Sequence, residues 1–210
     1  GRLMDAAIAW ARERQARRLL LQVRTDNAVA VGLYRHRGFV VVDTVHEMAL
    51  PRYGWPTPLG RPPAALRRPR LADRRAIGAL RGAPEAHPIV GAIGLLLRYL
   101  LMGDRTFEVV AAPQGEVMAY GLAEARTVRG PHEVSVYAHR EHRGAWEAAI
   151  LEWLLARLRT VPAQQVRATL SAHHPEAIGA AEGLGFRTVR VLDLMALDLP
   201  AQAGPGMRDP

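Results

Sequence analysis

The chain of 210 residues contains no cysteine and no lysine, and its only serines are Ser135 and Ser171. Without cysteine there is no disulfide scaffold, no cysteine-ligated metal centre and no thiol nucleophile. Without lysine, Schiff-base chemistry and the lysine of a phosphate-binding loop are excluded. Neither serine lies in a Gly-x-Ser-x-Gly turn, which argues against serine-hydrolase chemistry. If the protein is an enzyme, we expect a bound ligand to carry the reactive group.

All 28 basic residues are arginines, and they exceed the 20 acidic residues to give a net charge of +8. They are spread along the chain, and the 6% of aromatic residues are not interleaved with them in a pattern for stacking on bases. We interpret the excess as a composition bias that leaves a solvated basic surface. Attraction to an anionic ligand, such as a polyphosphate cofactor, is the alternative. Nucleic-acid binding is a third hypothesis, which a salt-dependent DNA shift assay would test.

Long hydrophobic runs are also missing. The longest, residues 89–97, ends at Arg98 and is far shorter than the about 20 residues that cross a bilayer. No segment has the pattern of a targeting signal, so we expect no membrane association and a cytoplasmic location. The chain begins with Gly1 rather than methionine, and we therefore expect a processed or incomplete chain.

An internal repeat organises the chain. The pair Gly38-Phe39 recurs as Gly185-Phe186, and at the same spacing of 147 residues the triplet at 48–50, Met-Ala-Leu, aligns without gaps with the identical triplet at 195–197. We infer the C-terminal half of one module followed by a whole copy. The predicted domains are residues 1–50 for the half module, 51–65 for a proline-rich linker, 66–199 for the complete second module and 200–210 for a flexible tail.

Local patterns predict a helix over residues 2–14, a strand over 19–23, and a helix that begins at Asn27 and ends before Gly38. A strand at 39–42 and its hairpin partner at 45–50 follow. The second copy repeats this order at 147–158, 165–170, 175–184 and 186–199, and the segment between adds a helix at 71–80 and strands at 107–112, 117–126 and 133–138. The predicted fold class is α/β, a mixed α+β layer of mostly antiparallel strands flanked by helices. A ligand site is expected at a strand-to-helix turn.

Residues 27–39 read Asn-Ala-Val-Ala-Val-Gly-Leu-Tyr-Arg-His-Arg-Gly-Phe. This segment resembles the N-x-x-A-x-x-L-Y-x-x-x-G-F signature of the GNAT superfamily of N-acetyltransferases. The resemblance implies that Asn27 contacts the pantetheine arm of acetyl-CoA and that Tyr34 is the general acid for the leaving thiolate. A tyrosine with an ordinary pKa near 10 can donate a proton to a thiolate. The alternative for Tyr34 is an aromatic ring packed on the inner face of its helix.

Residues 136–148 are similar to the strand, turn and helix start that carry the family's [QR]-x-x-G-x-[GA] motif. The resemblance implies that the pyrophosphate of acetyl-CoA is held by the arginine and the small residues of this turn: Arg143, Gly144, Ala145 and Ala148. Backbone amides at such a turn suit an anion.

The second copy departs from the family at its critical positions. Trp146 stands where the motif has glycine, and an indole there would crowd the phosphate path unless it points out of the turn. The repeat aligns Tyr34 with Ala181 and Asn27 with His174. We therefore expect the second module to be catalytically weak or inert.

The resemblance implies an acyltransferase that moves an acetyl group from acetyl-CoA to an amine by direct attack, without a metal. The acceptor is expected to be a small molecule or a peptide, and the chain to form a homodimer. Glu133 or Glu124 could deprotonate the amine, with solvated strand ends as the alternative. The rival function is a non-catalytic module of the same fold that binds a ligand or packs against a domain. We expect the histidines at 139, 142, 173 and 174 to be surface residues rather than metal ligands.

Overall fold

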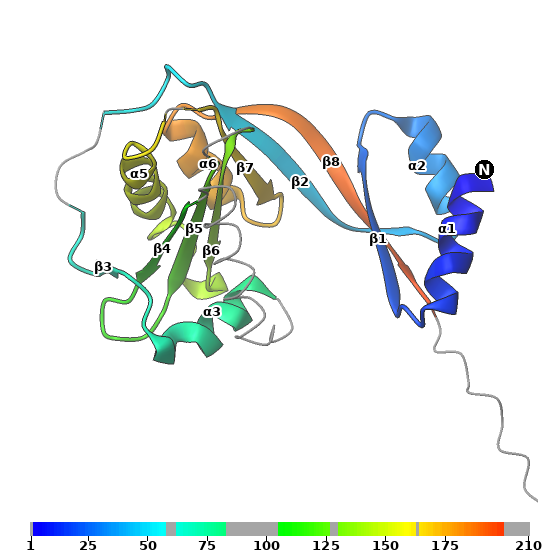
Figure 1. Cartoon of the computed structure of the whole chain (residues 1–210), viewed down its shortest axis with the longest axis horizontal. Helices are drawn as coiled ribbons and strands as arrows, with labels where there is room; N and C mark the ends of the chain where they lie inside the picture. The colour runs from blue at the N-terminus through cyan, green and yellow to red at the C-terminus, as the bar shows by residue number, and fades with distance from the viewer. Residues whose placement is uncertain (1, 58–61, 83–104, 127–129, 163, 200–210) are drawn as a thin grey trace, which may run out of the picture. The chain divides into compact units, whose positions relative to one another are not determined.

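The computed structural model describes residues 2–57, 62–82, 105–126, 130–162 and 164–199 (Figure 1). The helices are α1 (Arg2–Glu13), α2 (Ala28–Arg35), α3 (Arg74–Arg81), α5 (Glu147–Leu158) and α6 (Pro175–Gly183), with short 3₁₀ turns η1 (Leu71–Asp73) and η2 (Arg140–His142). The strands are β1 (Arg18–Arg24), β2 (Val40–Leu50), β3 (Leu66–Arg67), β4 (Arg105–Ala111), β5 (Ala119–Ala125), β6 (His132–Ala138), β7 (Val166–Ser171) and β8 (Arg187–Asp198). Among the described residues, no helix combines the length and apolar composition that a membrane span requires.

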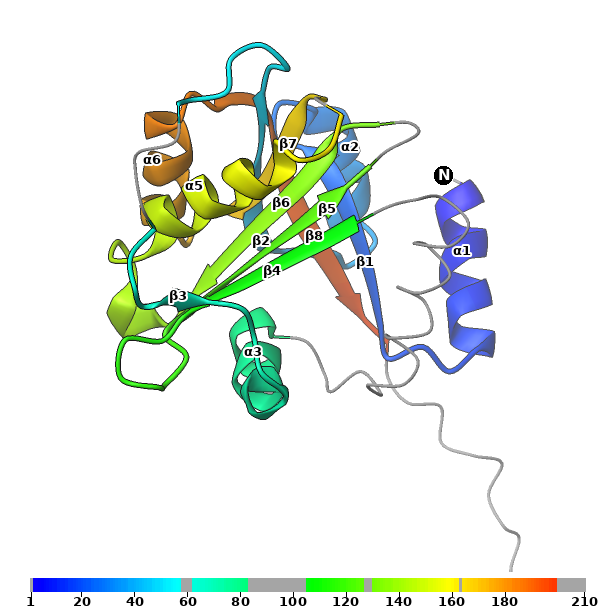
Figure 2. The same cartoon turned by 60° about the vertical axis from the view of Figure 1, so that its left-hand side comes forward.

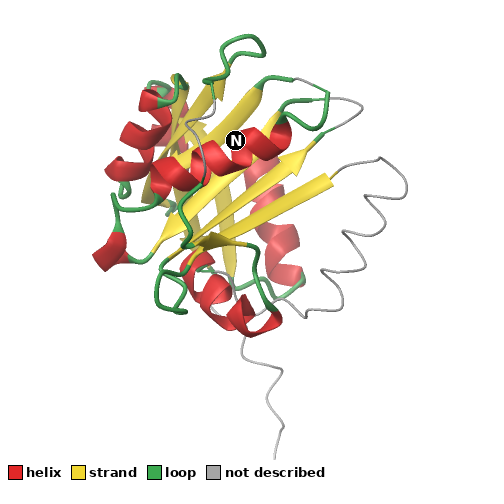
Figure 3. Ribbon diagram, turned by 90° about the vertical axis from the view of Figure 1, so that its left-hand side faces the viewer, coloured by secondary structure: helices red, strands yellow, loops and turns green. Residues whose placement is uncertain are grey.

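The strands form one sheet in the order β1-β8-β2-β7-β6-β5-β4-β3. The pairs β1–β8, β3–β4, β4–β5 and β5–β6 are antiparallel, whereas β6 and β7 are parallel. Helices pack on this mixed sheet (Figure 3). The predicted fold class, a mixed layer of mostly antiparallel strands flanked by helices, is confirmed.

The hairpin predicted over residues 39–50 is wrong, because β2 runs unbroken from Val40 to Leu50. No glycine or proline lies within this stretch to turn the chain. Thr44, in the middle of the strand, donates a hydrogen bond from Oγ1 to Asp193 Oδ1 of β8 at 2.9 Å. The residues at 43–44, which the prediction left between two strands, therefore lie inside one extended strand. The predicted tail, residues 200–210, lies outside the described residues.

Contacts between residues divide the described chain into two compact units. Unit 1 consists of residues 2–45 and 190–199, and unit 2 of residues 46–189 without the undescribed segments. The strands β2 and β8 thus each contribute residues to both units. The core of unit 1 lies between α1, α2, β1 and the end of β8, and its buried members are Ile8, Ala11, Val23, Val31, Phe39, Met195 and Leu199.

The core of unit 2 lies between α5 and strands β4 to β6, which α5 contacts (Figure 2). One face of α5 is buried there through Ile150, Leu151, Leu154, Leu155 and Leu158. The facing positions of β5 are all small: Ala119, Gly121, Ala123 and Ala125. On the opposite face of the sheet, Ile77 of α3 packs in a separate cluster with Val110 and Tyr120. Unit 2 therefore has helices on both faces of its strands.

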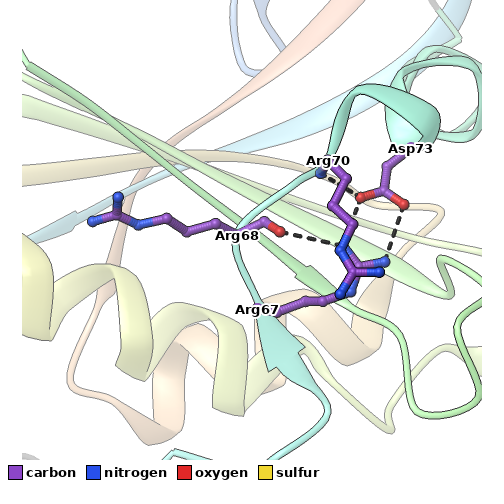
Figure 4. Close-up of polar contacts among 4 residues, drawn as sticks. All are labelled: Arg67, Arg68, Arg70 and Asp73. Atoms are coloured by element: carbon purple, nitrogen blue, oxygen red, sulfur yellow. Dashed lines mark hydrogen bonds and ion pairs between the residues drawn. The ribbon is translucent and has the colours of Figure 1, made fainter.

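A buried ion pair fixes the start of α3 (Figure 4). Asp73, which is 7% exposed, accepts two hydrogen bonds from the Arg67 guanidinium, at 2.6 and 3.0 Å, and one from the backbone N–H of Arg70 at 2.6 Å. The Arg67 hydrogen bonds, helped by the Arg70 amide, outweigh burial and lower the pKa of Asp73 from 3.8 to about 2. The ionised carboxylate therefore links β3 to η1, the turn that leads into α3.

Replacing Asp73 with asparagine is expected to lower the free energy of unfolding at pH 7 by about 2 kcal/mol, since charge-assisted hydrogen bonds are lost. Because the folded pKa lies below the unfolded value of 3.8, the pair stabilises the fold fully above about pH 4 and less as the pH falls toward 2. The difference between wild type and variant in urea denaturation should therefore shrink over that range. Asp26→Asn, which breaks an exposed and solvent-screened pair with Arg24, should cost much less. Equal losses in the two variants would contradict the prediction.

Candidate functional site

In unit 1 the two candidate residues lie on one helix. Asn27 is the N-cap of α2, and its Oδ1 accepts a hydrogen bond from the Ala30 N–H at 3.1 Å. Tyr34 lies two turns further on, is half-buried, and packs its ring against Phe39 at 6.0 Å between centroids. Its hydroxyl has no hydrogen-bond partner within the described residues. Packing accounts for the ring of Tyr34 and leaves its hydroxyl available for chemistry.

The glycine and phenylalanine of the signature stop α2 and set the position of Tyr34. Gly38 has φ of +85°, which suits glycine, and a Cβ there would lie 3.3 Å from Leu197 Cδ1. The Phe39 N–H donates to the Tyr34 carbonyl at 3.1 Å, and the Phe39 side chain is 2% exposed. The chain therefore turns back so that Phe39 lies beside Tyr34 in the core.

In unit 2 the predicted phosphate turn connects β6, through η2, to α5. Gly144 has φ of +84°, and the Ala145 N–H donates to the His142 carbonyl at 3.3 Å. Arg143 donates a hydrogen bond from Nη1 to the His173 carbonyl, while its buried Nε has no partner among the described residues. Ala148 is exposed in the first turn of α5. The structure thus brings Arg143, Gly144, Ala145 and Ala148 together at one helix start.

Glu147, which our sequence analysis did not single out, occupies this turn. It is 1% exposed, and its carboxylate accepts hydrogen bonds from the Gly144 N–H at 2.9 Å and the Trp146 N–H at 3.1 Å. His174 Nε2 lies 2.7 Å from Glu147 Oε1. Burial alone would raise the pKa of Glu147, but the hydrogen bonds from His174 and the backbone amides outweigh it and lower the pKa to about 2. Glu147 is therefore held as a buried anion.

Two further residues of unit 2 that differ from the family's motifs, Trp146 and Ala181, are apolar. The half-buried Trp146 packs against the main apolar core of this unit. Ala181, at the position that aligns with Tyr34, is fully buried in the same core. No hydroxyl stands at this place in unit 2.

Strands β6 and β7 separate within unit 2. Their pairing ends at Val134 and Ala168, although β6 continues to Ala138 and β7 to Ser171. A cavity of about 180 Å³ lies here, lined by Glu47, Glu133, Val134, Ser135, Arg167 and Thr169.

Charged side chains around this cavity pair with one another. Arg167 Nε lies 3.8 Å from Glu47 Oε1. Of the two candidate bases, Glu133 lies 3.5 Å and Glu124 3.4 Å from Arg126 Nη2. Both carboxylates thus share one arginine, so a role as base for either remains a prediction.

The histidines differ in their surroundings. The ligand atoms of His139, Glu141 and His142, at η2 and the residue before it, lie within 4.8 Å of one another, and His139 and Glu141 are exposed. His174 is 8% exposed and faces Glu147, so the prediction that it is a surface residue is wrong. Its imidazole is needed as a partner for the buried carboxylate. The expectation that no metal binds stays a prediction.

Comparisons with known proteins agree with this architecture. Residues 1–39 match the model of the acetyltransferase (GNAT) family. The chain resembles a solved GCN5-related N-acetyltransferase from Sphaerobacter thermophilus, with a TM-score of 0.68 and 17% identity over 93% of this chain and 66% of that one. The chain thus spans just under two thirds of that protein. No curated protein matches the chain.

Two further solved structures are similar to the chain. One is a tandem GNAT protein from the clavulanic acid biosynthesis pathway, with a TM-score of 0.60 and 18% identity over 93% of this chain and 68% of that one. The other is a GCN5-related N-acetyltransferase from Kribbella flavida, with a TM-score of 0.59 and 16% identity over 93% and 74% of the two chains. At these identities the likeness shows the fold, which is the GNAT fold. The match over residues 1–39 supports the resemblance to that superfamily.

Proposed function

We propose that the chain is an acetyl-CoA-dependent N-acetyltransferase, with Asn27 and Tyr34 of unit 1 as its functional residues. The observation that carries the proposal is the match of residues 1–39 to the GNAT family model, because this range holds Asn27, Tyr34, Gly38 and Phe39. The acceptor is an amine on a small molecule or a peptide. A homodimer and a cytoplasmic location belong to the same proposal.

Acetyl-CoA supplies the acetyl group as a thioester. The amine nitrogen bonds to the acetyl carbon while the carbon–sulfur bond breaks, and Tyr34 gives its hydroxyl proton to the leaving sulfur. The proton that the amine loses then restores the Tyr34 hydroxyl, directly or through water. Because the amine attacks directly, no enzyme nucleophile is needed, in keeping with a chain without cysteine. Asn27 would contact the pantetheine arm.

We also propose that the chain is a tandem, with the boundaries 1–50, 51–65, 66–199 and 200–210. Adding 147 to the residue numbers of α2 and β2 gives 175–182 and 187–197, and α6 and β8 span Pro175–Gly183 and Arg187–Asp198. The aligned Met48 and Met195 are both fully buried, one in the core of unit 2 and the other in the core of unit 1. Equivalent core positions at the repeat spacing support this organisation.

The second module is proposed to be degenerate. Ala181 cannot supply a proton, and Trp146 replaces the glycine of the phosphate motif. We therefore propose that the motif residues are retained from the family's pyrophosphate site but no longer serve it: Arg143, Gly144, Ala145 and Ala148. Acetyl transfer by this chain is assigned to unit 1.

Calorimetric titration with acetyl-CoA, together with an assay for thiol release in the presence of an amine panel, tests the proposal. Both are done on the 210-residue chain and on a polypeptide extended upstream of Gly1. We expect saturable binding and amine-dependent thiol release by at least the extended form. No binding by either form would overturn the acyltransferase function and favour the non-catalytic rival.

A further inference from the structure

The turn before α5 has the backbone of an anion site. Gly144 adopts φ of +84°, and the amides of Gly144 and Trp146 both point at one carboxylate, at 2.9 and 3.1 Å. Such converging N–H groups at the start of a helix bind phosphates in other proteins. Here the anion comes from the helix itself, as the side chain of Glu147.

This carboxylate is firmly held. Its Oε1 accepts from Gly144 and lies 2.7 Å from His174 Nε2, its Oε2 accepts from Trp146, and the residue is 1% exposed. An entering phosphate would have to displace the carboxylate or lie against it. Displacement takes the buried carboxylate away from its hydrogen-bond donors, and close approach sets two negative charges beside each other, which is unfavourable.

The residue that faces Glu147 differs from its aligned residue in unit 1. In unit 1, Asn27 caps its own helix by accepting from the Ala30 N–H. His174, the aligned residue in unit 2, makes no such cap and directs its ring to Glu147 instead. A second acidic residue, Glu176, lies beside the turn, with its Cγ 3.5 Å from the position of a Cβ on Gly144. The turn thus holds a resident carboxylate with a histidine partner, and a second acidic residue lies beside it.

We propose that Glu147 is the specificity-determining residue that keeps phosphate-bearing cofactors out of unit 2, its carboxylate occupying the place of the pyrophosphate. The inference rests on the proposed function in one respect, since the excluded cofactor is acetyl-CoA. Trp146 is not the obstacle, because its indole packs against the apolar core. The exclusion of phosphate from this turn therefore depends on the carboxylate of Glu147 and on its partner His174.

Nuclear magnetic resonance of the full chain tests this directly, with the Gly144 and Trp146 amides followed during titration with inorganic pyrophosphate and with CoA. The wild type should show no saturable shift of these two amides. Glu147→Ala should show a saturable shift and bind pyrophosphate at least 10-fold more tightly, while Glu147→Gln, which loses the charge but keeps an acceptor oxygen, should respond to an intermediate degree. Glu152→Gln, on the same helix and away from the turn, is the matched control and should behave like the wild type.

Saturable shifts of both amides in the wild type, equal to those in Glu147→Ala, would overturn the proposal. So would a turn that stays unresponsive in both Glu147 variants. Circular dichroism establishes whether Glu147→Ala is folded, and if it is not, the comparison between the wild type and Glu147→Gln decides. These readouts do not depend on turnover. If the chain releases no thiol, the proposed function is wrong. The titration with pyrophosphate still tests whether Glu147 keeps anions out of the turn, because it does not require acetyl transfer.

Discussion

Replacing Tyr34 with phenylalanine is expected to lower kcat for acetyl transfer by about 10²–10⁴-fold, the range typical of a lost general acid. The variant keeps the ring that packs against Phe39 and removes only the hydroxyl, which has no partner among the described residues. Its thermal stability should therefore match that of the wild type. Since proton donation to the sulfur takes place only in the transition state, KM should change little.

Tyr53→Phe is the matched control for this experiment. Tyr53 is 91% exposed and belongs to unit 2, so loss of its hydroxyl should leave kcat and KM unchanged. If Tyr34→Phe retained more than about a third of the wild-type kcat, Tyr34 would be a packing residue. The acid would then have to be sought elsewhere in unit 1.

The predicted repeat helped to locate the helices and strands in the sequence. The match at 147 residues located both helix-to-strand corners, because Gly38 and Gly185 each end a helix with positive φ and a buried phenylalanine follows each. Such helix ends can be predicted from the local sequence, because the left-handed backbone conformation that ends a helix is most easily adopted by glycine. The predicted helix at 147–158 coincides with α5.

What the sequence did not reveal depends on tertiary contacts. The strand β2 is continuous because its middle pairs with a strand 149 residues away in sequence, through Thr44 and Asp193. Likewise, Glu147 meets His174 across 27 residues, and nothing in the local pattern indicates that its carboxylate turns back to the preceding amides. The signal that was present is an acidic residue within a phosphate-binding motif, between Trp146 and Ala148. A negative charge at that place is itself a sign against phosphate binding.

Replacing Gly121 with valine is expected to destabilise unit 2 strongly, although strand propensity alone favours valine over glycine. A Cβ at Gly121 would lie 3.1 Å from both Leu154 Cδ1 and Val109 Cγ1, and closer still to Ile150 Cγ2. These neighbours belong to the fully buried core between α5 and the sheet, so they cannot move aside without disturbing it. Overpacking of this kind costs about 1–3 kcal/mol or more, which corresponds to a fall in Tm of roughly 2–12 °C for a chain of this size.

Gly179→Ala separates this packing effect from the general effect of adding a methyl group. Gly179 lies within α6, and a Cβ there would meet nothing within 4 Å. Its replacement should raise the free energy of unfolding by about 0.5–1 kcal/mol, because alanine favours the helix. Differential scanning calorimetry of the two variants should therefore show Tm shifts of opposite sign. If Gly121→Val melted at or above the wild-type temperature, α5 would not lie as closely on β5 as these contacts require, and the helix start that holds Glu147 would be less firmly anchored than we infer.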